Sequence, residues 1–163
     1  MRSLDVLLCD IDGTLLCKNP QGRRELYPGV LEAWKTLREQ LRIALVTNTT
    51  SMTREAIHQD LLSLGLDIDI NHLYTPAFVA RDHLVSRGLT RGIGFFAPAS
   101  RSEYSWFSED RESGSAVLVA DEGLAVTFRE VQQAFRLLMN GASLFTLQKN
   151  RFFKGKDGLC LDL

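Results

Sequence analysis

Leu7-Leu8-Cys9-Asp10-Ile11-Asp12-Gly13-Thr14-Leu15-Leu16 is the stretch that decides the fold of this chain. The apolar run before Asp10 has the length of a strand buried between two helical layers, and it ends in two carboxylates and a glycine. In open α/β sheets the ligand crevice lies beyond the carboxyl ends of the strands, so we expect Asp10 and Asp12 at its floor. Gly13 allows the chain to leave strand geometry at once, which both carboxylates need in order to face one crevice.

The spacing of the two carboxylates indicates a cation. Asp10 and Asp12 repel each other unless a positive charge offsets theirs, and a hard divalent metal such as Mg2+ prefers oxygen ligands of this kind. An acidic strand-to-loop turn, stabilised by a local bond from the Asp side chain, is the structural alternative.

A second apolar run, residues 42–46, also ends in small polar residues, starting with Thr47 and Asn48. Hydroxyl and amide groups at a strand end that leads into a helix can bind an anion, together with the free backbone N–H groups of the helix. Ordinary helix capping explains this segment equally well.

The order of elements predicts an α/β fold. Apolar residues recur at helical spacing over about residues 30–41 and 52–64, and Pro76 suits the first turn of a helix that runs to about Arg87, before Gly88. Short apolar runs precede these segments. Such alternation implies right-handed crossovers and a parallel sheet. Turn signals around residues 14–29 predict a loop or small hairpin over the crevice.

The pattern restarts after Gly88. Strands are expected at about residues 92–97, 115–120 and 143–147, and a capping box opens a helix at Thr127. We expect the packed face of that helix to consist of Val131, Ala134, Phe135, Leu138 and Met139. The pair Gly92-x-Gly94 is too little to predict a dinucleotide loop, because no third glycine follows in register. The predicted division is therefore residues 1–88 and a smaller α/β unit at residues 89–163.

The two strand-end motifs resemble those of the haloacid dehalogenase-like hydrolase superfamily. Asp10-x-Asp12-Gly13-Thr14 is similar to its first motif, and the strand that ends in Thr47-Asn48 is similar to its second. Residues 131–141 and 149–159 resemble the large α/β cap of the subgroup that contains 4-nitrophenylphosphatase, pyridoxal phosphate phosphatase and phospholysine phosphohistidine inorganic pyrophosphate phosphatase.

The resemblance implies a fold and a chemistry. The fold is a Rossmann-like parallel core, residues 1–88, with an inserted α/β cap at residues 89–163. The activity is that of a Mg2+-dependent phosphatase acting on a small phosphorylated metabolite through an aspartyl-phosphate. Asp10 would be the nucleophile and a metal ligand, and Asp12 the acid/base that also binds the metal through its backbone carbonyl. Gly13, Thr47 and Asn48 would bind the phosphate.

The chain departs from the superfamily after the cap. Relatives return to the core and supply a lysine and a Gly-Asp-rich strand end that ligates Mg2+, and neither motif precedes Leu163. We therefore expect the C-terminal part of the core to be missing and metal affinity to be weak. This gives a second hypothesis, in which the chain is a non-catalytic relative that binds phosphate or other proteins. A homodimer formed through the cap is the expected partner interaction.

Composition limits the partners. The net charge of -1 provides no broad basic field for nucleic acid, although Lys149-Asn150-Arg151-Phe152-Phe153-Lys154 is locally basic and aromatic. No apolar run is long enough to span a bilayer, and no leader is recognised. Three cysteines without paired spacing predict neither disulfides nor a zinc site. The expectation is a cytoplasmic protein that binds neither nucleic acid nor membrane.

Overall fold

The structure is a computed structural model that describes residues 5–121, 126–150, 152–155 and 158–161. Its contacts divide the chain into two units. The first comprises Met1–Thr47 and Arg54–Thr75, and the second comprises Asn48–Thr53 and Pro76–Leu163. The division predicted from sequence, into residues 1–88 and 89–163, stays a prediction. None of the described helices has the length and apolar character needed to cross a bilayer.

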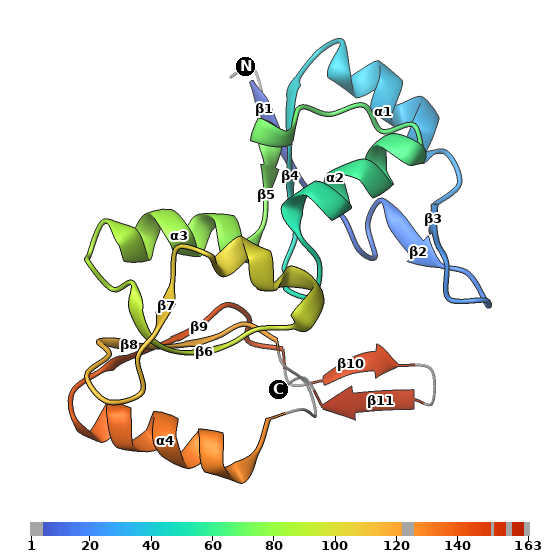
Figure 1. The fold of residues 1–163 in the computed structure, drawn as a ribbon. Helices are drawn as coiled ribbons and strands as arrows, with labels where there is room; N and C mark the ends of the chain where they lie inside the picture. Colours follow the sequence, from blue (N-terminus) through green and yellow to red (C-terminus); the bar gives the residue numbers. More distant parts are fainter. Residues whose placement is uncertain (1–4, 122–125, 151, 156–157, 162–163) are drawn as a thin grey trace. The chain divides into compact units, whose positions relative to one another are not determined.

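The first unit contains a three-stranded parallel sheet in the order β1-β4-β5 (Figure 1). Its register aligns Asp10 of β1 with Val46 of β4, and Val46 with Tyr74 of β5. Two helices make the crossovers, so the predicted alternation of strand and helix is confirmed. The elements are β1 (Val6–Asp10), α1 (Val30–Arg38), β4 (Arg42–Val46), α2 (Arg54–Ser63), a 3-10 turn η1 (Ile70–His72) and β5 (Leu73–Tyr74).

Helices cover one face of this sheet. Both crossovers step in the same direction across it, and right-handed connections that do so place their helices on the same side. The side chain of Leu31 in α1 accordingly comes within 3.3 Å of the Cβ position of Gly65, just after α2. On β1, Leu7 and Cys9 lie under α1, whereas Leu8 is 69% exposed. The prediction that β1 is buried between two helical layers was therefore wrong for the described residues.

A short hairpin follows β1, as the turn signals predicted. β2 (Leu16–Lys18) pairs with β3 (Arg24–Leu26) in antiparallel register. Asn19 closes the turn, because its Oδ1 accepts hydrogen bonds from the backbone N–H groups of Gln21, at 3.1 Å, and Arg23, at 2.9 Å. Gly22 takes a positive φ of 79°, which suits glycine.

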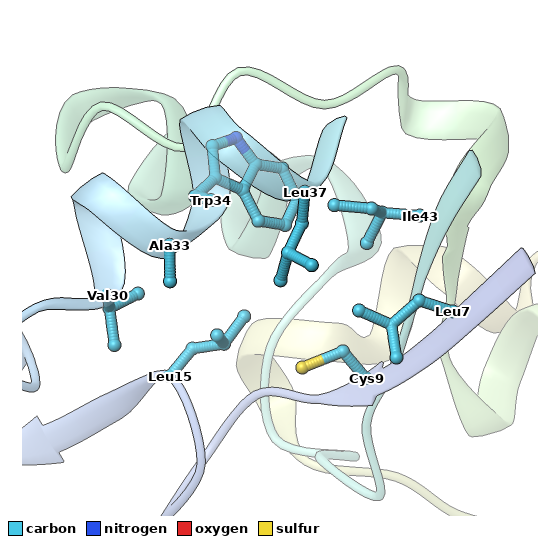
Figure 2. A pocket seen from close by; sticks show the side chains of 8 residues that line it. All are labelled: Leu7, Cys9, Leu15, Val30, Ala33, Trp34, Leu37 and Ile43. Atoms are coloured by element: carbon cyan, nitrogen blue, oxygen red, sulfur yellow. The ribbon is translucent and has the colours of Figure 1, made fainter. Parts of the chain in front are cut away.

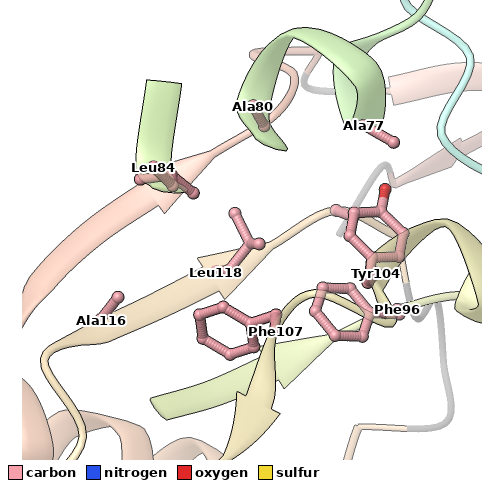
Figure 3. Close-up of a cluster of buried hydrophobic side chains, with 9 residues drawn as sticks. Ala77, Ala80, Leu84, Phe96, Tyr104, Phe107, Ala116 and Leu118 are labelled. Atoms are coloured by element: carbon pink, nitrogen blue, oxygen red, sulfur yellow. The ribbon is translucent and has the colours of Figure 1, made fainter. Parts of the chain in front are cut away.

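The second unit is built on a four-stranded parallel sheet in the order β7-β6-β8-β9. Successive residues of its strands alternate between two clusters. Leu118 faces a cluster formed with α3 and η2 (Figure 3), and Val117 faces a cluster formed with α4. The elements are α3 (Pro76–Val85), β6 (Arg91–Phe95), η2 (Pro98–Tyr104), β7 (Ser108–Glu109), β8 (Ala116–Val119), α4 (Phe128–Met139), β9 (Ser143–Thr146) and the antiparallel pair β10 (Phe152–Gly155) and β11 (Gly158–Leu161).

Helix α4 has the predicted start but not the predicted orientation. Thr127 and Glu130 form a full capping box. Ala134 is buried, as predicted, together with Leu137, which was not predicted. Three side chains of the expected packed face point to solvent instead: Val131, Phe135 and Met139. The small Ala134 lets the helix sit close to the sheet, and the larger apolar side chains occupy the opposite flank.

The glycines of β6 serve packing. A Cβ on Gly92 would lie 1.7 Å from the carbonyl oxygen of Ala116 in β8. A Cβ on Gly94 would lie 2.2 Å from the ring of Phe96. Gly114 is equally confined, because a Cβ there would lie 2.4 Å from the Cα of Gly92. These close approaches explain why glycine occupies these positions, without a role in binding a nucleotide.

Candidate active site at the carboxyl end of β1

Asp10 is the last residue of β1, and its side chain is exposed. The hydroxyl of Thr14 donates a hydrogen bond of 3.0 Å to its Oδ2. Within the described residues, no hydrogen bond reaches the other oxygen, Oδ1. One oxygen of this carboxylate is thus fixed and the other is open to an electrophile.

A tight loop after β1 turns the chain away from the sheet. Ile11 is fully buried, and its carbonyl oxygen accepts bonds of 2.9 Å from the N–H groups of both Leu15 and Leu16. Gly13 has a φ of 90° and donates its N–H to the carbonyl of Leu16 at 2.8 Å. This positive φ is the departure from strand geometry that the sequence predicted for Gly13, and it leaves Asp12 exposed beside Asp10 in the chain.

Asp12 belongs to an ion-pair network that sequence reasoning missed. Its Oδ1 lies 2.8 Å from Nη2 of Arg24 in β3. Nη1 of the same guanidinium lies 2.8 Å from Oδ2 of Asp60 in α2. Nothing in the sequence marks this triad, because its members come from a loop, a hairpin and a helix that only the fold brings together.

The predicted phosphate-binding residues fall in two groups. Thr47 directly follows β4, which ends level with Asp10, and its side chain is 5% exposed. Its backbone N–H donates a bond of 3.1 Å to the carbonyl of Tyr74. The first unit therefore contains four of the predicted site residues, at the carboxyl ends of its strands: Asp10, Asp12, Gly13 and Thr47. Asn48 is exposed and groups with the second unit, so its part in the site stays a prediction.

The described residues contain no group of three or more His, Cys, Asp or Glu side chains that could hold a metal ion. Mg2+ nevertheless needs few protein ligands, since it keeps several waters and is usually bound through one or two carboxylates and a substrate phosphate. Asp10 supplies a carboxylate of that kind, and the backbone carbonyl of Asp12 is the second protein oxygen that the resemblance implies. The donor set fits a weakly held Mg2+.

An apolar cavity of about 70 Å3 lies on the helix-covered face of the first sheet (Figure 2). Neither Asp10 nor Asp12 lines this cavity. Its lining includes Trp34 and Leu37 of α1 and Ile43 of β4, together with other apolar residues. The thiol of Cys9 points into it, and burial, with a smaller contribution from the charge of Asp10, raises the pKa of that thiol. A cavity with this lining offers a phosphate no cation and, apart from the Cys9 thiol, almost no polar surface, so we interpret it as a packing gap.

Comparison with known proteins identifies what this architecture is similar to. The profile of the haloacid dehalogenase-like hydrolase family matches residues 7–132. Haloacid dehalogenase-like hydrolase domain-containing protein 2 of Bos taurus is 30% identical over 161 residues, which are 98% of this chain and 59% of the relative. Phospholysine phosphohistidine inorganic pyrophosphate phosphatase of Danio rerio is 29% identical over 166 residues, which are 100% of this chain and 60% of the relative.

Solved structures agree on the fold. The crystal structure of 4-nitrophenylphosphatase from Thermotoga maritima superposes with a TM-score of 0.83 at 22% identity, over 98% of this chain and 60% of that one. Glycerol phosphate phosphatase from Mycobacterium tuberculosis, in complex with magnesium, gives a TM-score of 0.78 at 19% identity, over 96% of this chain and 48% of that one. The chain thus spans about three-fifths of the length of the relatives it matches first.

Proposed function

Because the chain belongs to the haloacid dehalogenase-like hydrolase family, we propose that it is a phosphatase that hydrolyses small phosphate monoesters through an aspartyl-phosphate on Asp10. The observation that supports this most directly is the Asp10 carboxylate, which is exposed at the carboxyl end of β1 with Oδ2 bonded to Thr14. Phosphatases among the relatives support the same reaction class.

The chemistry divides into two displacements. In the first, Oδ1 of Asp10 forms a bond to phosphorus, the bond from phosphorus to the ester oxygen breaks, and Asp12 gives its proton to the departing oxygen. In the second, Asp12 takes a proton from water as the water oxygen bonds to phosphorus. The bond between phosphorus and Asp10 then breaks, which releases inorganic phosphate and restores the Asp10 carboxylate and the protonated Asp12.

Mg2+ is the cofactor of this proposal, bound by the carboxylate of Asp10 and the backbone carbonyl of Asp12. When bound, it offsets the negative charge of the phosphoryl oxygens, which otherwise repel an attacking carboxylate. The hydroxyl of Thr47, the amide of Asn48 and Gly13 are the proposed phosphate contacts. Gly13 lies in the loop after β1, where its own N–H donates to the carbonyl of Leu16. A small phosphorylated metabolite in the cytoplasm is the proposed substrate.

The test is phosphate release from 4-nitrophenyl phosphate by the purified chain, with Mg2+ and with EDTA. We expect release only with Mg2+, and we expect Asp10→Asn to abolish it. Asp82→Asn is the matched control, since Asp82 is an exposed aspartate of α3 that pairs with its neighbour Arg81. Undiminished hydrolysis by Asp10→Asn would exclude the mechanism, and an inactive wild-type chain would exclude the activity.

One observation favours a second candidate, a non-catalytic module that forms a homodimer through the cap. Three large apolar side chains on one stripe of α4 are strongly exposed: Phe128 by 80%, Phe135 by 59% and Met139 by 71%. Residues spaced by seven and four lie on one side of a helix, so these side chains form a continuous apolar strip. A second copy of the same strip is the occupant we propose.

Sedimentation velocity tests this candidate. A homodimer through α4 should become a monomer in Phe135→Glu, because a carboxylate would be buried against an apolar partner. Gln132→Glu is the control, since it adds the same charge to an exposed position of the same helix. A wild-type monomer across the micromolar range would exclude the dimer.

A further inference from the structure

We infer that Arg24 is a positioning residue for Asp12, holding the proposed acid/base carboxylate in one orientation from the hairpin that follows the site. The inference rests on the proposed function, because Asp12 needs a fixed orientation only if it exchanges protons with a substrate. It assigns a role to a residue outside both strand-end motifs.

The contacts of Arg24 are those of a clamp. Its two terminal nitrogens lie 2.8 Å from carboxylate oxygens on different elements, Asp12 in the loop after β1 and Asp60 in α2. The guanidinium is planar and rigid, so two such bonds hold its plane, and the bond from Nη2 holds Oδ1 of Asp12 in place. The side chain of Arg24 is only 15% exposed, which further restricts its movement.

The hairpin that holds Arg24 is itself anchored to the loop. Arg24 pairs with Lys18 in the β2–β3 ladder, and the N–H of Tyr27 donates to the carbonyl of Leu15 at 3.0 Å. The turn at Asn19 closes the other end with backbone and side-chain bonds. Arg24 therefore approaches Asp12 from a fixed backbone rather than from a loose loop.

Two other roles fit the contacts less well. If Arg24 bound the substrate phosphate, it would do so from a guanidinium whose two terminal nitrogens already face carboxylates on two elements. If it served stability alone, one partner on α2 would be enough, and partly exposed ion pairs contribute little. A positioning role explains why Arg24 also bonds to Asp12, the proposed catalytic carboxylate.

Steady-state kinetics separate these roles. For Arg24→Met we expect kcat for 4-nitrophenyl phosphate to fall about tenfold to a hundredfold, with KM within about twofold of the wild type. Arg24→Lys should recover part of the loss, because it restores one charged bond but not the fork. Arg38→Met is the matched control, since Arg38 forms an exposed pair with Asp67 at 2.9 Å. A rise in KM with kcat retained would overturn the inference in favour of phosphate binding.

A second measurement does not depend on activity. A guanidinium held by two carboxylates rotates slowly about its Cζ–Nη bonds, so NMR should resolve separate Nη–H signals for Arg24 in the wild type. These signals should merge in the double variant Asp12→Asn, Asp60→Asn. Merged signals in the wild type would overturn the clamp. Separate signals in a wild-type chain that releases no phosphate would support the clamp and refute the proposed function.

Discussion

The hydroxyl of Thr14 donates a hydrogen bond of 3.0 Å to Oδ2 of Asp10, four residues earlier in the chain. The bond fixes one oxygen of the proposed nucleophile, so that the other is presented to phosphorus. Its donor is exposed, which means that it can be removed without opening the core.

For Thr14→Val we therefore expect kcat/KM for 4-nitrophenyl phosphate to fall about tenfold to a hundredfold, the range for a lost bond to a charged group. Thr14→Ser keeps the hydroxyl and should stay close to the wild type. Thermal melting of both variants checks that the fold is intact. Equal rates for the Val and Ser variants would show that the hydroxyl does not orient Asp10.

Gly92→Ala should destabilise the second unit by about 3 kcal/mol or more, because strands β6 and β8 would have to move apart. The cause is the 1.7 Å approach of the new Cβ to the carbonyl of Ala116. Urea denaturation followed by far-UV circular dichroism measures the change. Ser115→Ala, at an exposed position next to β8, is the control and should stay within about 0.5 kcal/mol.

The open face of the first sheet predicts contrasting mutational effects. Leu45 of β4 is fully buried, so Leu45→Ala should cost about 2–5 kcal/mol of unfolding free energy. Leu8 of β1 is largely exposed, so Leu8→Thr should cost no more than about 0.5 kcal/mol. Chemical denaturation of the two variants measures both values. A large loss in Leu8→Thr would mean that this face is covered in solution.

The capping box of α4 predicts a pH-dependent contribution to stability. Hydrogen bonds from Thr127, first its hydroxyl and then its backbone N–H, lower the pKa of Glu130 below the usual 4.5. The native state therefore binds fewer protons than the unfolded state in this window, and stability rises with pH. The contribution is complete above about pH 4.5 and is lost as the pH falls through the lowered folded value.

Glu130→Gln isolates this effect, because an amide still accepts the cap bonds but does not titrate. We expect the melting temperature of the wild type to exceed that of the variant at pH 7, and the difference to shrink towards pH 3. All other acids are common to both proteins, so their titration cancels. A difference that is independent of pH would show that the charge of Glu130 is irrelevant to the cap.

The parts of the fold that the sequence predicted are those set by local pattern. Periodic apolar residues predicted α1 and α2, Pro76 predicted the start of α3, and turn residues predicted the β2–β3 hairpin. The capping box at Thr127 identified the first residue of α4. The exposed carboxylates of Asp10 and Asp12 and the positive φ of Gly13 follow from the residues of the first motif alone.

The parts that were missed depend on which layers surround an element. Leu8 lies in an apolar run, but its burial requires a second helical layer that the described residues do not supply. In α4 the apolar residues span a wide arc, and the pattern does not say which part of that arc meets the sheet. The Arg24 bridge was missed for a similar reason, since it joins Asp12 to Asp60 across three elements.

Strand β1 pairs only with β4 in the described sheet, so its second edge is open. For protein engineering this edge is an attachment point. A strand grafted in parallel along it would end level with Asp10, and its last side chain would lie beside the proposed nucleophile. New functional groups could then be brought to the site on the grafted segment, with every residue of the original chain left unchanged.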